Sequence, residues 1–188
     1  MSYGSNMCRT RLEHYLHGGQ MPGAKRAHPG ARDHSAPRAS RGVELPGRLY
    51  FAGESTTWTG GVAFYDHDTP GPTPARAHLM TIAQFTDVTA QEMHRIPRDG
   101  DPLEEVVING LSTGRHQAGP GRYETLIEVG RCEQDIPMIT FTAPHGISAV
   151  EHTRPAPAYL DMLAAGLEEA HGWDRDRADA FFDSVMIS

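Results

Sequence analysis

Basic charge is scarce in this sequence of 188 residues. It has 17 lysine and arginine residues against 24 aspartate and glutamate residues, which gives a formal net charge of -7. A protein that binds nucleic acid needs a surplus of positive charge to neutralise phosphates. We therefore expect no nucleic-acid partner.

Long apolar runs are also missing. No segment approaches the roughly 18 consecutive apolar residues of a membrane-spanning helix. The first residues lack the basic and apolar regions of a secretory signal. The two cysteines, Cys8 and Cys132, are too few for a disulfide framework, so we expect reduced thiols. We expect a cytoplasmic protein without a membrane partner.

The apolar content is nevertheless sufficient for a folded domain. Hydrophobic residues make up 38% of the chain and charged residues 22%, and one core commonly serves about 100 to 200 residues. We expect a single domain over residues 1–188. Residues 22–46 and 97–122 are rich in Gly or Pro and have little apolar periodicity, so we expect long loops or excursions there. The basic residues of the first loop are expected to be solvated, and the second has room for one short strand at 106–108.

Strands and helices alternate along the rest of the chain. Short aromatic or β-branched segments predict strands over 48–53, 61–66, 75–80, 123–129 and 138–142. Helical spacing and capping residues predict helices over 7–16, 81–94, 157–171 and 174–186. This order predicts an α+β fold.

The turn Tyr3-Gly4-Ser5-Asn6 stands directly before the first predicted helix. Gly4 can adopt backbone angles that are closed to other residues. The amide groups that follow it belong to the first turn of a helix, where N–H groups lack intrahelical partners. Such a turn can bind an anion, although a capped turn without a ligand has the same sequence.

Five segments follow one another in an order that belongs to a known family. They read Tyr3-Gly4-Ser5-Asn6-Met7, Trp58-Thr59-Gly60-Gly61-Val62-Ala63, Gln91-Glu92 at the end of a helix, Tyr123-Glu124-Thr125-Leu126-Ile127-Glu128-Val129, and Pro155-Ala156-Pro157-Ala158-Tyr159. In this order they resemble the γ-glutamyl cyclotransferase family. The resemblance covers most of the chain and implies a small mixed β-barrel flanked by helices, with no metal or organic cofactor. The family's first strand precedes the turn, and here only Met1 and Ser2 stand before Tyr3.

The resemblance implies an enzyme that releases an amine and 5-oxoproline from a γ-glutamyl amide. Glu92 is the residue that matches the family's catalytic glutamate, a general base and acid whose work suits a carboxylate with a raised pKa. The substrate, a small-molecule γ-glutamyl amine or peptide, is expected to bind the backbone of Tyr3, Gly4, Ser5, Asn6 and Met7. The hydroxyls of Tyr123 and Tyr159 are expected to line the same pocket. The sequence carries no signal for an oligomeric state.

Three alternatives remain open. The 11 histidines raise the possibility of a metal-dependent amidase or deacetylase, but the chain has no His-Glu-x-x-His, and His14 and His17 match no known ligand pattern. Asp66-His67-Asp68 reads as a polar turn more readily than as a metal site. Ser55 lacks the second glycine of a serine hydrolase motif. The third alternative is a non-catalytic ligand-binding module on the same fold.

Overall fold

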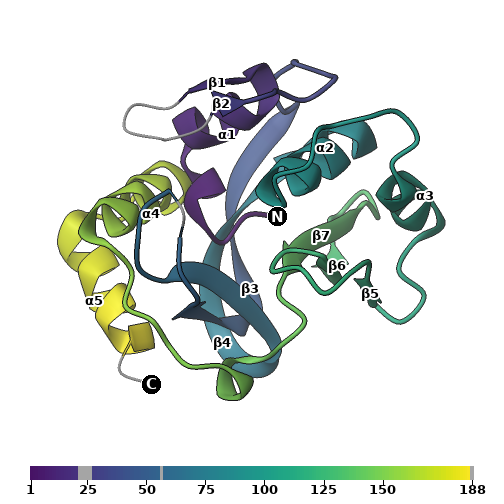
Figure 1. The fold of residues 1–188 in the computed structure, drawn as a ribbon. Coiled ribbons are helices and arrows are strands. Elements are labelled where there is room, and N and C mark those ends of the chain that lie inside the picture. The colour runs from purple at the N-terminus through teal and green to yellow at the C-terminus, as the bar shows by residue number, and fades with distance from the viewer. Residues whose placement is uncertain (21–26, 56, 187–188) are drawn as a thin grey trace. The chain divides into compact units, whose positions relative to one another are not determined.

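The computed structural model describes residues 1–20, 27–55 and 57–186 (Figure 1). These residues form five α-helices, two short 3-10 helices and seven strands. The mixture confirms the predicted α+β class. The strands of the described part form two two-stranded sheets and one three-stranded sheet; a barrel that contains them stays a prediction.

The chain folds into two compact units, and each unit combines segments that are distant in sequence. Unit 1 contains Met1, Glu13–Ser40 and His78–Pro144, and unit 2 contains Ser2–Leu12, Arg41–Ala77 and His145–Ser188. The expectation of a single domain over 1–188 stays a prediction.

Unit 1 is organised around a three-stranded antiparallel sheet. Its strands are β5 (Arg115–Gln117), β6 (Thr125–Arg131) and β7 (Pro137–Thr142), in that order. Two helices, α2 (Ile82–Glu92) and α3 (Pro102–Asn109), contribute Phe85 and Leu103 to an apolar cluster with Leu126 and Ile139 of the sheet. A short ribbon of β1 (Gly19–Gln20) and β2 (Ala27–His28) completes the unit.

Unit 2 contains most of a long two-stranded sheet, the pair of β3 (Ala39–Ala52) and β4 (Val62–Leu79). The predicted strands 48–53, 61–66 and 75–80 all lie within or at the end of this pair, but both strands are longer than expected. β4 continues through Pro70, Pro72 and Pro74. A two-stranded sheet tolerates these prolines because each strand has an edge whose N–H groups need no partner.

The start of the chain forms a turn and a helix. The 3-10 helix η1 (Ser5–Met7) is followed by α1 (Arg9–His17), which ends at Gly18 with a φ of 78°. The helix predicted over 7–16 is therefore present. The helix stop that Gly18 predicts is also present, because a left-handed residue commonly follows the last helical turn.

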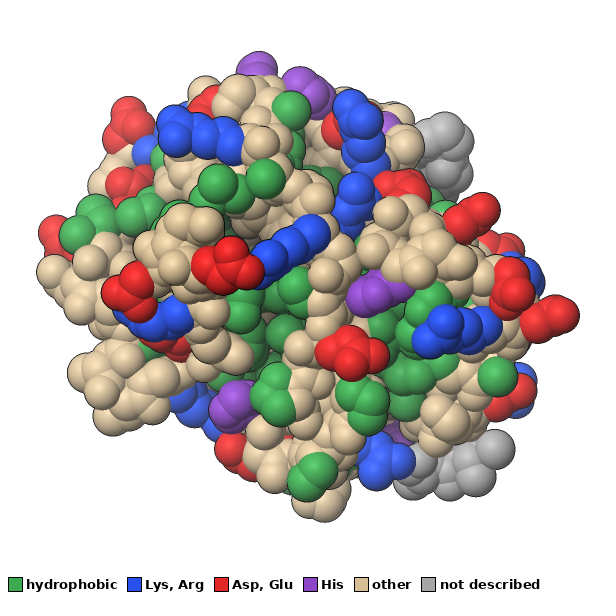
Figure 2. All heavy atoms as spheres, turned by 180° about the vertical axis from the view of Figure 1, so that it is seen from behind, with side chains coloured by type: hydrophobic (Ala, Val, Ile, Leu, Met, Phe, Trp, Pro, Cys, Tyr) green, Lys and Arg blue, Asp and Glu red, His purple; other side chains and the backbone are tan. Residues whose placement is uncertain are grey.

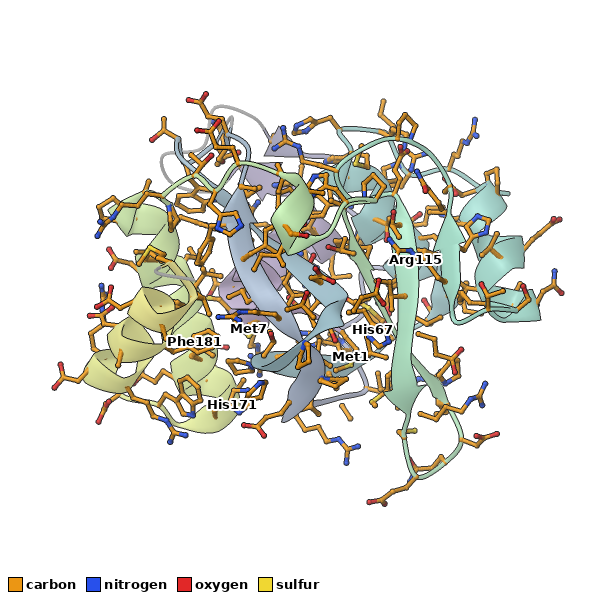
Figure 3. The ribbon with its side chains drawn as sticks, turned by 90° about the horizontal axis from the view of Figure 1, so that it is seen from below. Met1, Met7, His67, Arg115, His171 and Phe181 are labelled. Atoms are coloured by element: carbon orange, nitrogen blue, oxygen red, sulfur yellow. The ribbon has the colours of Figure 1, made fainter. Side chains whose placement is uncertain are left out.

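Two helices close the chain. α4 (Pro157–His171) and α5 (Arg175–Met186) have the predicted bounds to within one residue, and they lie side by side (Figure 1). Asp174 caps α5 as expected, because its carboxylate accepts a hydrogen bond from Arg177 N at 2.9 Å. Figure 3 labels Phe181 of α5 and His171 at the end of α4, whose ring nitrogen Nε2 lies 2.9 Å from the carbonyl oxygen of Ala75 on β4.

Two predicted loops need correction. Residues 39–46 of the first belong to β3, and residues 22–26 lie outside the described residues. In the second, the apolar residues 106–108 belong to helix α3 and not to a strand. Asp101 caps this helix by accepting a hydrogen bond from Leu103 N at 3.0 Å, and Pro102 is its first residue. An N-cap followed by proline is a helix start, and this signal outweighs the strand preference of valine and isoleucine.

No helix in the described residues is long and apolar enough to span a membrane. Acidic and basic side chains are intermixed on the face drawn in Figure 2.

Candidate functional site

The turn at Tyr3 to Met7 is attached to strand β4 through Ser2, the residue before it. Ser2 and Arg76 form an antiparallel bridge, with Ser2 N donating to Arg76 O at 2.9 Å and Arg76 N donating to Ser2 O at 2.7 Å. The turn therefore begins from a defined backbone position, even though no named strand precedes it in the structure.

The conformation of the turn differs from the expected one in two respects. Gly4 has φ -111° and ψ -155°, which residues other than glycine also adopt. Met7 N donates to Gly4 O at 3.0 Å and Cys8 N to Ser5 O at 3.1 Å, so the amide of Met7 is already used inside the turn. The N–H group of Met7 therefore leaves the set of backbone amides that were expected to bind the substrate. The N–H groups of Gly4 and Ser5 lie outside these two hydrogen bonds.

Charged side chains hold the end of the turn against β4 and α4. Nη1 of Arg76 donates to Met7 O and to Oε2 of Glu169, both at 2.7 Å, and Arg9 N donates to the same carboxylate at 2.9 Å. Burial alone would raise the pKa of Glu169, but the hydrogen bonds from Arg9, Arg76 and Cys8 hold it below its usual value. Burial and the nearby charge of Glu169 raise the pKa of the Cys8 thiol.

Helix α4 approaches the turn closely because it has a glycine at the contact. A Cβ on Gly166 would lie 2.7 Å from Cβ of Met7 and 2.9 Å from the backbone nitrogen of Cys8. Both distances are well below an ordinary contact between non-bonded heavy atoms, about 3.5 to 4.0 Å. The residue at 166 thus sets how near η1 can lie to α4.

Tyr159 joins the turn at the start of α4. Its ring is 4% exposed, and its hydroxyl accepts a hydrogen bond from Ala63 N at 3.3 Å. A Cβ placed on Gly4 would lie 3.7 Å from this hydroxyl and 3.8 Å from Cβ of Ala63. The ring centre of Trp58 lies 6.0 Å from that of Tyr159. Three of the five segments that resemble the family therefore meet in unit 2.

The glycine pair after Trp58 has a structural role. Gly61 N donates to Arg154 O at 2.9 Å, and a Cβ on Gly61 would lie 2.0 Å from the carbonyl oxygen of Thr153. The hydroxyl of Ser55 accepts hydrogen bonds from two amides of this turn, including Trp58 N at 2.8 Å. Ser55 thus stabilises the turn that leads to Ala63.

Tyr3 packs into the interior of unit 2. It is 5% exposed, and its ring centre lies 5.6 Å from that of Tyr65 on β4. The hydroxyl of Tyr65 accepts a hydrogen bond from Gly47 N at 2.9 Å. Burial raises the pKa of Tyr65, which keeps it a neutral packing partner for Tyr3.

Glu92 is the last residue of α2 in unit 1 and is half-buried. The helix starts at a capping box formed by Thr81 and Gln84. Its last turn is fixed by Gln91, whose Nε2 donates to Tyr15 O at 2.9 Å and whose Oε1 accepts from Gly30 N at 3.3 Å. These bonds position the backbone that carries Glu92.

Tyr123 lies near the end of α2 that carries Glu92. A Cβ on Gly121 would lie 2.1 Å from Cε of Met93, and Arg95 Nη2 lies 3.5 Å from Oε1 of Glu124. Tyr123 stands between Gly121 and Glu124, in the turn before β6 and not on the strand, because β6 begins at Thr125. The strand bounds predicted over 123–129 are thus two residues early.

The predicted site residues are thus distributed over both units. Tyr3, Gly4, Ser5, Asn6, Met7 and Tyr159 belong to unit 2, and Glu92 and Tyr123 to unit 1. That Glu92 and the turn contact one substrate stays a prediction.

Arg32 is an organising residue that sequence reasoning missed. Its guanidinium bonds Asp87 of α2 at 2.9 Å, Asp99 at 2.9 Å and Glu104 of α3. These hydrogen bonds, the one to Asp87 above all, raise the pKa of Arg32. The expectation of a solvated basic loop is therefore wrong for this residue. No local pattern predicts these ion pairs, because the three partners of Arg32 stand 55, 67 and 72 positions away in the sequence.

The carboxylate of Asp66 accepts several hydrogen bonds within unit 2. These come from Asp68 N at 2.9 Å, the hydroxyl of Thr69 at 3.0 Å and Ile147 N at 2.8 Å. Burial alone would raise the pKa of Asp66, and these hydrogen bonds hold it below its usual value. No group of three or more potential metal ligands among His, Cys, Asp and Glu occurs within the part of the chain that the structure describes.

Unit 2 also has a pocket of about 280 Å³. It is lined by Phe51, residues 152–154 and the last residues of α5, Val185 and Met186. None of the residues predicted to bind substrate lines it.

Comparisons with known proteins agree on the fold. A solved structure of a γ-glutamyl cyclotransferase is similar to this chain with a TM-score of 0.55 and 16% identity, covering 98% of this chain and 85% of that one. A crystal structure of an uncharacterised protein from Homo sapiens is similar with a TM-score of 0.55 and 17% identity, and with the same coverage. At these identities the likeness shows a shared fold.

In sequence, the chain is similar to a much longer protein. It is 31% identical over 201 residues to a protein of Arabidopsis thaliana named Histone deacetylase 5, which covers 98% of this chain and 30% of that protein. The chain thus spans less than a third of the length of this curated relative. No protein-family model matches the chain.

Proposed function

We propose that this chain is a γ-glutamyl cyclotransferase-like enzyme. The proposal rests above all on one observation: Gly4 of the predicted substrate turn lies beside the hydroxyl of Tyr159 and Cβ of Ala63, and the Ala63 N–H donates to that hydroxyl. Three segments of the family pattern, far apart in sequence, thus meet at one place. The shared fold supports the same assignment.

The turn binds the glutamyl α-carboxylate in this proposal. The N–H groups of Gly4 and Ser5, outside the hydrogen bonds of the turn, donate to its oxygens, as successive backbone amides do in other anion sites. The hydroxyl of Tyr159 accepts from Ala63 N, and its own proton can point toward a substrate oxygen. Binding there folds the substrate so that its amine approaches its own side-chain carbonyl.

Glu92 moves the protons. The α-ammonium first gives a proton to the Glu92 carboxylate, and the resulting amine attacks the γ-carbonyl carbon. A new C–N bond closes the five-membered ring, and Glu92 returns the first proton to the leaving nitrogen as its bond to the carbonyl carbon breaks. The ring nitrogen then gives its second proton to the departing amine, which leaves as an ammonium ion. No water is consumed. The attack is intramolecular, so much of the rate comes from orientation, and the base contributes about 10² to 10⁴-fold.

Incubation with a panel of γ-glutamyl amines tests the proposal, with 5-oxoproline detected by mass spectrometry. Glu92→Gln keeps the shape of the side chain but removes the base, so we expect kcat to fall by about 10² to 10⁴-fold. Glu105→Gln is the matched control, because Glu105 is an exposed residue of α3. Free glutamate as the product would mean hydrolysis and would refute the cyclisation. Undiminished turnover in Glu92→Gln and Glu92→Ala would remove Glu92 from its role.

The name of the plant relative favours a second candidate, a metal-dependent amidase or deacetylase. Both candidate enzymes cleave an amide bond, but the amidase or deacetylase needs a metal ion and water. Metal analysis of the purified, tag-free protein, together with an assay for acetate release from an acetyl-lysine peptide, separates the two. One zinc per chain with acetate release would replace the first proposal. Saturable binding of a γ-glutamyl amine without turnover would instead identify a non-catalytic module.

A further inference from the structure

The pocket of about 280 Å³ lies entirely within unit 2. Its walls come from Phe51 near the end of β3, from residues 152–154, and from Val185 and Met186 in the last turn of α5. Ligand pockets in proteins have volumes of about 300 to 1,000 Å³, so this one suits a small organic molecule. It is separate from the predicted substrate turn, because no residue of that turn lines it.

The backbone of residues 152–154 is fixed by hydrogen bonds at the end of β3 and just before β4. Thr153 N donates to Phe51 O at 3.0 Å, and Gly61 N donates to Arg154 O at 2.9 Å. The approach is close at Gly61, where a Cβ would lie 2.0 Å from the carbonyl oxygen of Thr153. The segment that carries the polar lining side chains is therefore in place before a ligand binds, which lowers the entropic cost of binding.

Three of the lining side chains are apolar. Phe51 and Val185 are 3% and 7% exposed, and Met186 is half-buried at the end of α5. A methionine side chain is flexible and polarisable, so it adapts to ligands of different shapes. Burial against these side chains stabilises a hydrocarbon chain or an aromatic ring, because it removes apolar surface from water.

The polar lining side chains include one strong cation. Arg154 is exposed and forms no ion pair within the described residues. Nε2 of His152 lies 2.9 Å from the carbonyl oxygen of Ile147, so this nitrogen already donates its proton to the protein. None of the described residues that line the pocket is acidic. The guanidinium of Arg154 therefore favours a carboxylate, which it can bind with two parallel hydrogen bonds.

The charge around the pocket favours a ligand with a single negative charge. The last turn of α5 lines the pocket, and the carbonyl groups at the end of a helix carry partial negative charge. The whole chain also has a formal net charge of -7. One guanidinium offsets one carboxylate, whereas a phosphate or a dicarboxylate brings further negative charge that is repelled.

We propose that this pocket binds a small monocarboxylate with an apolar part. The guanidinium of Arg154 binds the carboxylate, and Phe51, Val185 and Met186 contact the apolar chain or ring. This second site is independent of the proposed function, because it uses neither the turn nor Glu92.

Calorimetric titration of the native chain with three probes tests the proposal. Benzoate has both a carboxylate and a ring, benzamide has the ring without the charge, and acetate has the carboxylate without the ring. We expect saturable binding of one benzoate per chain. Benzamide and acetate should each bind at least tenfold more weakly, because one loses the charge-assisted hydrogen bonds and the other the apolar burial. Absence of saturable benzoate binding, or equal affinity for benzamide or acetate, would overturn the proposal.

Arg154→Gln removes the charge and keeps a polar side chain. Its affinity for benzoate should be about 10- to 100-fold lower, the loss expected for hydrogen bonds to a charged group. Arg41→Gln is the matched control, because Arg41 is also exposed in unit 2, forms no ion pair in the described part of the chain and does not line the pocket. The control should bind benzoate within about twofold of the native affinity. Equal losses in both variants would indicate a general effect of charge and refute the site.

The methyl signal of Met186 locates the bound probe. In protein labelled with ¹³C at the methionine methyl groups, the signal that disappears in Met186→Leu belongs to Met186. Benzoate should shift this signal through the ring current of the probe, with the dissociation constant found by calorimetry. A shift of the Met7 signal without a shift of the Met186 signal would place benzoate at the predicted substrate turn, and the proposal would fail.

Discussion

Gly166→Ala is the most direct perturbation of the predicted substrate turn, because it changes α4 and leaves every residue of the turn intact. The added Cβ would lie 2.7 Å from Cβ of Met7 and 2.9 Å from the nitrogen of Cys8. To reach a contact of about 3.5 Å, one side must move by roughly 0.6 to 0.8 Å. Gly166 lies in the interior of a 15-residue helix, so we expect the short turn to move.

The expected loss of stability is small. Alanine in a helix interior is favoured over glycine by about 1 kcal/mol. Overpacking of a buried contact costs about 1 to 3 kcal/mol. The free energy of unfolding should therefore fall by about 0 to 2 kcal/mol. Catalysis is more sensitive, since a misplacement of about 1 Å can cost 10²-fold, and we expect kcat/KM for a γ-glutamyl amine to fall by about 10- to 100-fold.

Gly172→Ala, at the C-cap of the same helix, is the matched control. Gly172 has a φ of 65°, and a Cβ there would meet nothing within 4 Å. The left-handed conformation costs alanine about 1 to 2 kcal/mol, so the control loses similar stability without touching the turn. Urea unfolding gives the free energies, and initial rates at matched folded fraction give kcat/KM. If both variants have the same kcat/KM within about twofold, the contact with α4 does not position a functional turn and the reasoning fails.

Two further changes test how each unit is held together. Arg32→Ala leaves Asp87, whose side chain is 1% exposed, without its main partner. Urea unfolding should show that the free energy of unfolding falls by an amount near the lower end of the roughly 3 to 5 kcal/mol for a broken buried pair. Adding Asp87→Asn to this variant should restore part of the lost free energy, and additive losses of the two changes would contradict the assignment. The pKa of Asp66 is lower in the folded chain than in the unfolded one, where it is about 3.9, so its stabilisation is present above about pH 4 and is lost as the pH falls through the folded pKa. Melting curves from pH 2 to 7 should therefore fall less steeply below pH 4 for Asp66→Asn, and parallel curves would exclude the assigned role.

Local signals predicted the elements that are governed by local interactions. The starts of α2 and α5 follow from side-chain caps at Thr81 and Asp174, which act over three residues. The end of α1 follows from Gly18. Each of these interactions is complete within one turn of the chain, so the sequence around it contains all the information.

The failures have a common physical cause. Two separate strands were predicted at 61–66 and 75–80, but β4 continues between them through Pro70, Pro72 and Pro74. Proline is tolerated in a strand where its missing N–H would face an unpaired edge, and β4 is hydrogen-bonded to only one named strand, β3. The residues of β3 before Leu45 are exposed or half-buried, so they have no apolar periodicity to reveal a strand. In both places, pairing with a strand distant in sequence overrides local preference.

The candidate site divides in the same way. The candidate chemistry-bearing residues were predicted because the family pattern names them, but the residues that hold the turn in place were not predicted. The turn is held by Arg76, 69 positions from Met7, and by Glu169, 160 positions from Arg9. Tyr159 reaches Ala63 across 96 positions. These contacts use common residue types with no periodic spacing.

This arrangement has a consequence for the turn itself. Gly4 has ordinary backbone angles, and a Cβ there would make only normal contacts at 3.7 and 3.8 Å. Backbone strain therefore does not explain a glycine at this position. What a side chain would change is the space beside the hydroxyl of Tyr159, where the proposed carboxylate binds. In the proposed function, the glycine leaves the backbone of the turn accessible to the substrate, and this access depends on the contacts with β4 and α4 that hold the turn against Tyr159. A peptide with the sequence of the turn alone would lack the site.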